Sequence, residues 1–156
     1  MERTLILLKP DALQRRLAGR ILRRFEEKGL QIVGLKLLQM DRATAESHYA
    51  PHRERPFFPG LIRYIVSSPI VALALEGRNA VALCRKMMGA TFGSKAEPGT
   101  IRGDLAISDG YNLIHGSDSP EAAKEELARF FRPAELIAWT PTDLPWVYEN
   151  AGGELR

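Results

Sequence analysis

Residues 112–119 read Asn-Leu-Ile-His-Gly-Ser-Asp-Ser and join a short expected strand, at residues 111–115, to a well-marked helix start. Ser119 is a typical helix N-cap and Pro120 suits the first helical position, so the sequence predicts a helix over residues 120–131. A histidine just ahead of a helix N-terminus lies near free backbone N–H groups, which bind phosphate readily. This stretch therefore predicts the last strand and helix of the fold, with a histidine beside an expected anion site.

Elsewhere in the sequence, continuous apolar runs alternate with segments in which apolar residues recur at helical spacing. Continuous apolar runs predict buried strands, and helical spacing with an N-cap or a C-terminal glycine predicts helices. Residues 90–103 form a long expected loop, and loops of that length in compact domains are usually functional. The expected strands are residues 4–8, 31–39 and 70–75, and the expected helices are residues 19–28, 41–49, 60–66 and 79–88.

This order of elements fits a ferredoxin-like βαββαβ topology. We expect an α/β protein of the α+β type, in which helices cover a four-stranded antiparallel sheet. The sequence of 156 residues has no repeat, low-complexity tract or linker, so a single domain over residues 1–156 is expected.

The composition excludes several classes of protein. The sequence has no apolar run near the roughly 18 residues of a membrane span, and the N-terminal apolar segment ends at Lys9, too soon for a signal peptide. The single cysteine, Cys84, fits a reducing compartment, so we expect a cytoplasmic protein with no membrane partner. The net charge of +3 leaves nucleic acid open as a partner. It is disfavoured, because the strands at residues 4–8 and 70–75 contain no aromatic residue to stack on bases.

Phosphoryl transfer needs a nucleophile, cations around the phosphates and a means of holding the nucleotide in line. His115 is the candidate nucleophile, because a neutral imidazole is nucleophilic near neutral pH when a partner orients its second nitrogen. Glu126 is the candidate partner, since it lies at the edge of the apolar face of its helix, whereas Glu125 points away. The spacing leaves equally open that Glu126 is an ordinary acid at the rim of the core.

The cation candidates are Lys9, Arg85 and Arg102. Lys9 ends a buried strand, Arg85 lies on a helix before the long loop, and Arg102 lies within that loop. Arginine matches phosphate oxygens with a planar fork, although each of these residues taken alone is more often a surface charge. The sequence has neither a Walker A element nor a G-x-G-x-x-G element, so P-loop and Rossmann sites are excluded.

Two other groups of residues, a possible metal pair and a possible catalytic triad, are not supported by the sequence. His48 and His52 have the i, i+4 spacing of a helical metal pair, but Pro51 between them ends the helix. The serine and aspartate that follow His115 are triad residue types, but closeness in sequence does not indicate triad geometry.

Five short motifs follow one another along the chain. They are Lys9-Pro10-Asp11; His48-Tyr49 followed by Arg55-Pro56-Phe57-Phe58; Arg85 ahead of Gly89 and Thr91; Pro98 to Asp104; and Asn112 to Asp118. In these motifs and their order the chain resembles the nucleoside diphosphate kinases over roughly residues 3–149.

The resemblance implies a phosphohistidine enzyme. His115 would carry the phosphoryl group, oriented by Ser117 and Glu126. Asp118 would help to position Mg²⁺ through water, because that ion keeps much of its hydration and depends on substrate phosphates for its other ligands. The reaction would be a ping-pong transfer of the γ-phosphoryl group from a nucleoside triphosphate such as ATP to a nucleoside diphosphate.

The same resemblance implies how nucleotides are held. Phe57 would stack on the base, while Lys9 and Asn112 would hold the ribose hydroxyls. Since stacking reads no base edge, broad tolerance of bases is expected, with ATP, GTP and other nucleotides as substrates. The phosphates would be surrounded by Tyr49, Arg85, Thr91 and Arg102.

The resemblance also implies a homo-oligomer, and the ending Trp146-Val147-Tyr148-Glu149 favours a hexamer over a tetramer. Phe92-Gly93 departs from the family's Asn-Pro pair, which contributes to subunit contacts, and Asp109 replaces an apolar residue beneath the base. Ala12 and Arg16 stand where the family commonly has glycine. A rival interpretation, a non-catalytic nucleotide-binding scaffold, predicts the loss of a site residue, and none is lost.

Overall fold

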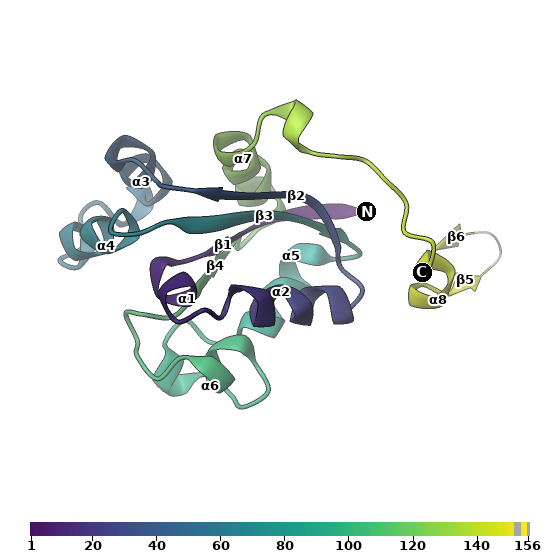
Figure 1. The fold of residues 1–156 in the computed structure, drawn as a ribbon, viewed down its shortest axis with the longest axis horizontal. Coiled ribbons are helices and arrows are strands. Elements are labelled where there is room, and N and C mark those ends of the chain that lie inside the picture. The colour runs from purple at the N-terminus through teal and green to yellow at the C-terminus, as the bar shows by residue number, and fades with distance from the viewer. Residues whose placement is uncertain (152–153, 156) are drawn as a thin grey trace.

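Four antiparallel strands form one sheet in the order β2-β3-β1-β4 (Figure 1). The computed structural model describes residues 1–151 and 154–155. β1 lies between β3 and β4 and pairs antiparallel with both, which places the strand that leads to Lys9 beside the strand that carries His115. The expected α+β fold with a ferredoxin-like sheet is confirmed. The strands are β1 Glu2–Leu8, β2 Gln31–Leu38, β3 Ile70–Gly77 and β4 Ile114–Gly116.

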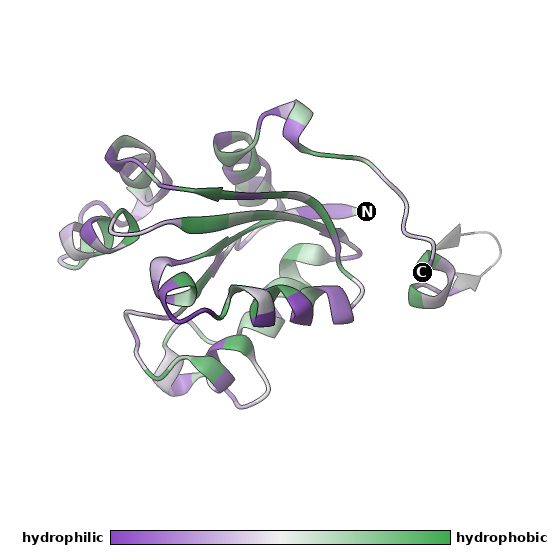
Figure 2. Cartoon of the chain, viewed as in Figure 1, coloured by the Kyte–Doolittle hydropathy of each residue, from purple (hydrophilic) through white to green (hydrophobic). Residues whose placement is uncertain are grey.

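Helices cover both faces of this sheet. Leu5 and Leu7 of β1 pack in one apolar cluster with α3, α4 and α7, whereas Ile6 and Leu8 pack in a second cluster with α2, α5 and α6. Because both faces are covered, residues 5–8 of β1 form a continuous apolar run rather than an alternating one. Figure 2 shows β2 and β3 mostly in the hydrophobic colour. The helices are α1 Pro10–Gln14, α2 Ala18–Glu27, α3 Arg42–His48, α4 Phe58–Ile65, α5 Ala80–Met88, α6 Ile101–Leu105, α7 Pro120–Phe130 and α8 Leu144–Val147.

The expected helix starts at Ser119 and Asp41 are confirmed by their caps. The Ser119 hydroxyl accepts a hydrogen bond from the Ala122 amide at 3.0 Å, and the Asp41 carboxylate accepts one from the Thr44 amide at 2.7 Å. Such caps satisfy backbone N–H groups that the helix itself leaves unpaired. Asn79 precedes α5 as expected, but its side chain forms no capping bond.

Three helices, α1, α6 and α8, were not expected from the sequence. Residues 9–11 were interpreted only as the end of a strand, but Pro10 begins α1, where its missing N–H costs nothing. The expected loop over residues 90–103 ends early, because Thr100 caps α6 by accepting a hydrogen bond from the Gly103 amide at 3.0 Å. The loop also contains a short 3₁₀ turn, Gly93–Lys95.

The fourth strand is shifted from the expected residues 111–115 to Ile114–Gly116. The reason is Leu113, whose φ of 69° lies outside the range of extended backbone. Arg16 also has a positive φ, 57°, a backbone conformation that glycine adopts more readily than arginine.

The C-terminal segment runs beyond α7 through the 3₁₀ turn Pro133–Glu135 to α8 and the short strands β5 Asn150–Ala151 and β6 Glu154–Leu155 (Figure 1). It is anchored to the sheet edge, because the Trp139 indole donates a hydrogen bond to the Ile32 carbonyl at 3.0 Å. No helix in the described part of the chain is long and apolar enough to span a membrane.

Candidate active site

His115 lies on β4, and its ring faces the helix that follows. Its Nε2 lies 3.1 and 3.0 Å from the two carboxylate oxygens of Glu126 on α7. The Ser117 hydroxyl donates to the same carboxylate at 2.6 Å and accepts a hydrogen bond from the Leu5 amide at 3.3 Å. A carboxylate can only accept, so this arrangement assigns the ring proton of His115 to Nε2 and leaves the lone pair on Nδ1.

Glu126 is held as a carboxylate by these neighbours. Burial alone would raise its pKa, but hydrogen bonds from His115 and Ser117 outweigh burial and lower the pKa of Glu126. Glu126 is only partly exposed, whereas Glu125 is exposed, as the helical spacing predicted. The charge of Glu126 therefore lies against the imidazole.

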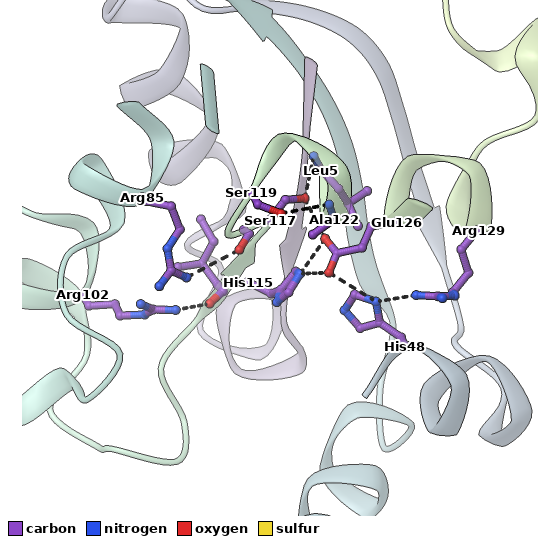
Figure 3. A network of polar contacts seen from close by, with 12 residues as sticks. Leu5, His48, Arg85, Arg102, His115, Ser117, Ser119, Ala122, Glu126 and Arg129 are labelled. Atoms are coloured by element: carbon purple, nitrogen blue, oxygen red, sulfur yellow. Dashed lines mark hydrogen bonds and ion pairs between the residues drawn. The ribbon is translucent and has the colours of Figure 1, made fainter. Parts of the chain in front are cut away.

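His48, at the end of α3, packs against this pair and was missed as a site residue. Its ring lies edge-on to that of His115, with the centroids 4.6 Å apart, and its Nδ1 lies 4.0 Å from a Glu126 oxygen and 3.5 Å from the Arg129 guanidinium (Figure 3). Burial and the nearby His115 lower the pKa of His48 to about 3, so it is neutral near pH 7. The sequence signal that could have found it was its place directly before Tyr49.

Two buried polar atoms beside the nucleophile candidate have no hydrogen-bond partner among the described residues. They are Nε2 of His48 and the Tyr49 hydroxyl. The Tyr49 ring lies 6.2 Å from that of His115, centroid to centroid, and burial raises the pKa of its hydroxyl, which stays protonated. Unpaired buried donors are costly, and both are suited to a bound acceptor.

One set of side chains in the described part of the chain could hold a metal ion. The ligand atoms of His48, His115 and Glu126 all lie within 4.8 Å of one another. Two imidazoles and a carboxylate suit zinc rather than magnesium. The hydrogen bond between His115 and Glu126 would have to break, and the Arg129 cation faces His48, so we assign no metal to this set.

Lys9 and Asn112 are joined by a hydrogen bond between their side chains. The buried Lys9 ammonium donates to the Asn112 side-chain oxygen at 2.8 Å, and the Asn112 amide donates to the Thr91 carbonyl at 2.7 Å. Burial and the Arg102 charge lower the pKa of Lys9 to about 8. The two candidates for ribose binding are therefore adjacent, and both are nearly buried.

Arg102 is buried and fully engaged with backbone. Its guanidinium donates to the carbonyls of Asn112 at 3.2 Å, Ile114 at 2.6 Å, Gly89 at 3.1 Å and Ala90 at 3.3 Å. Arg102 therefore joins the segment before His115 to the end of α5. Its pKa is lowered to about 10 by burial and by the nearby Arg85, and the side chain stays charged near pH 7.

Arg85 is exposed and donates a long hydrogen bond, 3.5 Å, to the Gly116 carbonyl. Figure 3 shows Arg85 and Arg102 on one side of His115, with Glu126 and His48 on the other. The imidazole thus stands between two guanidinium groups and a carboxylate, an arrangement that suits an incoming anion.

Three predicted site residues have exposed side chains that take no part in this described cluster, although the Thr91 carbonyl binds Asn112. Phe57 is 55% exposed and its ring lies 5.7 Å from that of His52. The side chains of Thr91 and Asp118 are exposed as well. Their roles stay predictions.

Two departures from the resemblance, Gly93 and Asp109, are linked through Ser94. A side chain at Gly93 would place its Cβ 2.5 Å from the Ala106 carbonyl, so the close backbone approach requires glycine. The adjacent Ser94 donates hydrogen bonds to Asp109 from its amide at 3.2 Å and its hydroxyl at 2.6 Å. Asp109 therefore stabilises the loop that Gly93 begins.

Leu113 forms the centre of a tight turn between Asn112 and His115. The Ile114 amide donates to the Asn112 carbonyl at 2.8 Å, which is the i to i+2 bond of a γ-turn. With φ of 69° at a fully buried leucine, this is the rare and strained form of the turn, at a cost of about 1–3 kcal/mol. Strained backbone of this kind persists only where the surroundings hold it.

Comparison with known proteins agrees with this arrangement. The family model for nucleoside diphosphate kinase matches residues 2–136. A nucleoside diphosphate kinase from Synechococcus elongatus is 58% identical over 149 residues, which cover 96% of this chain and all of that protein. One from Thermosynechococcus vestitus is 52% identical over a similar span.

Solved structures give the same result. A nucleoside diphosphate kinase from Halobacterium salinarum, in complex with CDP, superposes with a TM-score of 0.93 at 47% identity, covering 95% of this chain and 99% of that one. An enzyme from Encephalitozoon cuniculi superposes with a TM-score of 0.91 at 40% identity. The chain therefore belongs to the nucleoside diphosphate kinase family, and its activity is the phosphoryl transfer of that family.

Proposed function

We propose that His115 carries the phosphoryl group, with Nδ1 as the attacking atom. Nδ1 would form a bond to the γ-phosphorus of a nucleoside triphosphate as the bond to the bridging oxygen breaks, and the diphosphate would leave with that electron pair. A second diphosphate would then take the group back by the reverse step. The observation that carries this proposal is the pair of contacts between Nε2 of His115 and Glu126, which leaves Nδ1 free to react.

Glu126 and Ser117 orient the ring in this proposal. When Nδ1 bonds to phosphorus, the imidazole gains positive charge, and the adjacent Glu126 carboxylate stabilises it. Ser117 holds that carboxylate through its 2.6 Å hydrogen bond. The Tyr49 hydroxyl, buried and unpaired among the described residues, would donate to an oxygen of the transferred group.

Positive charge around the phosphates would come from Lys9, Arg85 and Arg102. A loose phosphoryl-transfer transition state spreads negative charge over the equatorial oxygens, and fixed cations stabilise it. Mg²⁺, when bound, would neutralise phosphate charge. Asp118 fits it as a hard oxygen donor, exposed and close to His115 in sequence, and Mg²⁺ dependence is therefore part of this proposal.

The nucleotide would be held by few base contacts. The exposed Phe57 ring offers a stacking face, and Asn112 with Lys9 offers hydrogen bonds for ribose hydroxyls, while Thr91 would contact the phosphates. The relative from Halobacterium salinarum binds CDP, which supports nucleoside di- and triphosphates, ATP and GTP among them, as substrates here. Broad base tolerance follows, because stacking reads no base edge.

A two-step labelling experiment tests the proposal. The protein is mixed with γ-labelled ATP and Mg²⁺, freed of nucleotide, and examined for acid-labile label, after which unlabelled GDP, UDP or CDP is added. We expect label on wild type that moves to each acceptor, and none on His115→Ala. Label on the His115→Ala protein would contradict the mechanism, and a preference of about a hundredfold for one base would contradict the stacking account. If label forms on the protein without Mg²⁺, the proposed Mg²⁺ dependence is wrong.

We also propose that the chain acts as a single domain in a homo-oligomer, a hexamer rather than a tetramer, in the cytoplasm. β2 is an edge strand that exposes Leu35 and Leu37, and Trp146 of the C-terminal segment is 92% exposed. An exposed apolar edge of this kind favours association. Light scattering during size-exclusion chromatography should give a mass near six chains, and a monomer would contradict the proposal.

A further inference from the structure

The strained turn at Leu113 is held from one side by the junction between β1 and α1. The Leu113 amide donates to the Asp11 carboxylate at 3.1 Å, and the Leu113 carbonyl accepts a hydrogen bond from the Lys9 amide at 2.8 Å. Both polar groups of the strained residue are thus bound by one short segment. The contact with Lys9 is between backbone atoms, whereas the contact with Asp11 uses its side chain. A substitution of Asp11 can therefore remove the second contact without removing the first.

Asp11 is itself fixed from α4. The Tyr64 hydroxyl donates to the other Asp11 oxygen, so the two oxygens of one carboxylate bridge α4 and the turn. Burial and this hydrogen bond raise the pKa of the Tyr64 hydroxyl, which therefore remains a donor near pH 7. A carboxylate bound at both oxygens has little freedom to move away from Leu113.

The turn lies between two parts of the proposed site. Asn112, directly before Leu113, accepts the hydrogen bond from the Lys9 ammonium, and His115 follows two residues later. Arg102 binds the carbonyls on either side of Leu113, those of Asn112 and Ile114, but it cannot bind the Leu113 N–H, because a guanidinium only donates. The orientation of the central peptide therefore depends on Asp11.

We propose that Asp11, held by Tyr64, is a positioning residue for the phosphoryl transfer: it maintains the strained turn at Leu113 and so sets His115 in place relative to Lys9 and Asn112. Asp11 touches neither nucleotide nor phosphate in this proposal and acts through the backbone. The inference rests on the proposed role of His115. A small displacement of a nucleophile is costly, because a shift of about 1 Å can slow a reaction by roughly a hundredfold.

The test compares Asp11→Ala with Asp11→Asn. The asparagine side-chain oxygen can still accept from the Leu113 amide, and its NH₂ group can donate to the Tyr64 oxygen, whereas alanine can do neither. We measure the single-turnover rate of His115 phosphorylation and, separately, the nucleotide Kd, on protein shown to be folded by circular dichroism. Glu46→Ala, which removes a carboxylate from an exposed pair with Arg42, is the matched control.

We expect Asp11→Ala to slow phosphorylation by about 10- to 100-fold while the nucleotide Kd changes by less than about threefold. Asp11→Asn should remain within about threefold of wild type, as should Glu46→Ala. An Asp11→Ala protein that is phosphorylated at the wild-type rate overturns the inference. So does an Asp11→Asn protein as slow as Asp11→Ala, since that result would assign the effect to charge.

Leu113→Gly provides a second measurement, a double-mutant cycle with Asp11→Ala. Glycine adopts a positive φ without strain, so removing Asp11 should cost less when residue 113 is glycine. We expect the rate loss caused by Asp11→Ala to be at least about fivefold smaller in the Leu113→Gly background, and equal losses in both backgrounds contradict the inference. Tyr64→Phe, which leaves Asp11 in place, should slow phosphorylation by only about two- to fivefold. A wild-type rate in this variant would show that Tyr64 does not contribute to the positioning role of Asp11.

Failure of this inference is distinguishable from failure of the proposed function. If wild-type protein forms no phosphohistidine at His115, the proposed function is wrong. If wild type is labelled normally and the rates of the Asp11 variants do not differ, only the positioning role of Asp11 is wrong.

Discussion

Both carboxylate oxygens of Glu126 lie within hydrogen-bond distance of Nε2 of His115, at 3.1 and 3.0 Å. This single relationship fixes the tautomer of the ring, directs Nδ1 away from α7 and places a negative charge where the phosphorylated imidazole would gain a positive one. The guanidinium groups of Arg85 and Arg102 approach from the opposite side (Figure 3). The site therefore separates the group that would orient the proposed nucleophile from the groups that would receive the phosphates.

Replacing Glu126 should slow chemistry more than binding. Glu126→Ala removes the acceptor at Nε2, so we expect kcat to fall by about 10²-fold with little change in KM, whereas Glu126→Gln keeps an acceptor oxygen and should lose less. Steady-state kinetics of both variants test this, with the exposed Glu125→Gln as control. A Glu126→Ala protein with unchanged kcat would contradict the orienting role.

Arg85 and Arg102 should differ in what their removal costs. Arg102→Ala leaves four backbone carbonyls without their donor, so we expect stability to fall by about 3 kcal/mol or more together with a loss of transfer worth about 2–4 kcal/mol. Arg85→Ala should lose activity on a similar scale while stability stays within about 0.5 kcal/mol, because its side chain is exposed. Urea denaturation and transfer assays on both proteins separate these outcomes. Equal stability of the two variants, or a loss of transfer of only about tenfold in Arg102→Ala, would contradict the assignment.

The pKa of Lys9 predicts an alkaline limit to activity. Burial and the Arg102 charge lower that pKa to about 8, so in the free enzyme Lys9 is a cation below this pH and neutral above it. If its charge serves the phosphates, kcat/KM should decline as the pH rises through about 8, and Lys9→Arg should flatten that decline, because arginine keeps its charge. A profile of kcat/KM from pH 6 to about 10 tests this, and an identical alkaline limb in both proteins would assign it to another group.

His48 predicts loss of stability in acid. The pKa of His48 is lowered to about 3, whereas an unfolded histidine titrates near 6.5, so the unfolded chain binds the extra proton between these values. Stability should therefore fall as the pH drops below about 6.5, by up to about 1.4 kcal/mol per pH unit from this residue. The free energy of unfolding of His48→Gln should depend less on pH between about 5 and 7 than that of wild type, whereas the exposed His52→Gln should behave as wild type does. Parallel slopes in His48→Gln and wild type would show that His48 does not carry this dependence.

Much of this site follows from local sequence signals, which is why parts of it were predictable. The helical spacing of α7 places Glu126 at the rim of the core, Ser119 starts that helix with a side-chain cap, and the apolar run ending at Lys9 marks a buried strand. Each of these features depends on residues within one or two turns of each other. The sheet order that joins β1 to β4 then brings Lys9 beside Asn112.

The features that escaped prediction depend on tertiary contacts. His48 reaches His115 only because α3 packs on the same face of the sheet as α7. The spacing of His48 to His52 suggested only a helical metal pair, which Pro51 excludes. The positive φ of Leu113 has no local signal such as a glycine, because Asp11 and the Lys9 backbone hold it from another part of the chain. The hydrogen bonds from Arg102 to backbone carbonyls could not be predicted either, because the motif that contains Arg102 indicates only a cation.

The central claim is that His115 accepts the phosphoryl group at Nδ1 while Glu126 retains Nε2. The measurement that tests it most directly is NMR of the protein with ¹⁵N-labelled histidine rings, phosphorylated with ATP and Mg²⁺ and freed of nucleotide. The account predicts that phosphorus couples to Nδ1 of His115 and that Nε2 remains protonated. Phosphorus on Nε2, or on a residue other than His115, would contradict it.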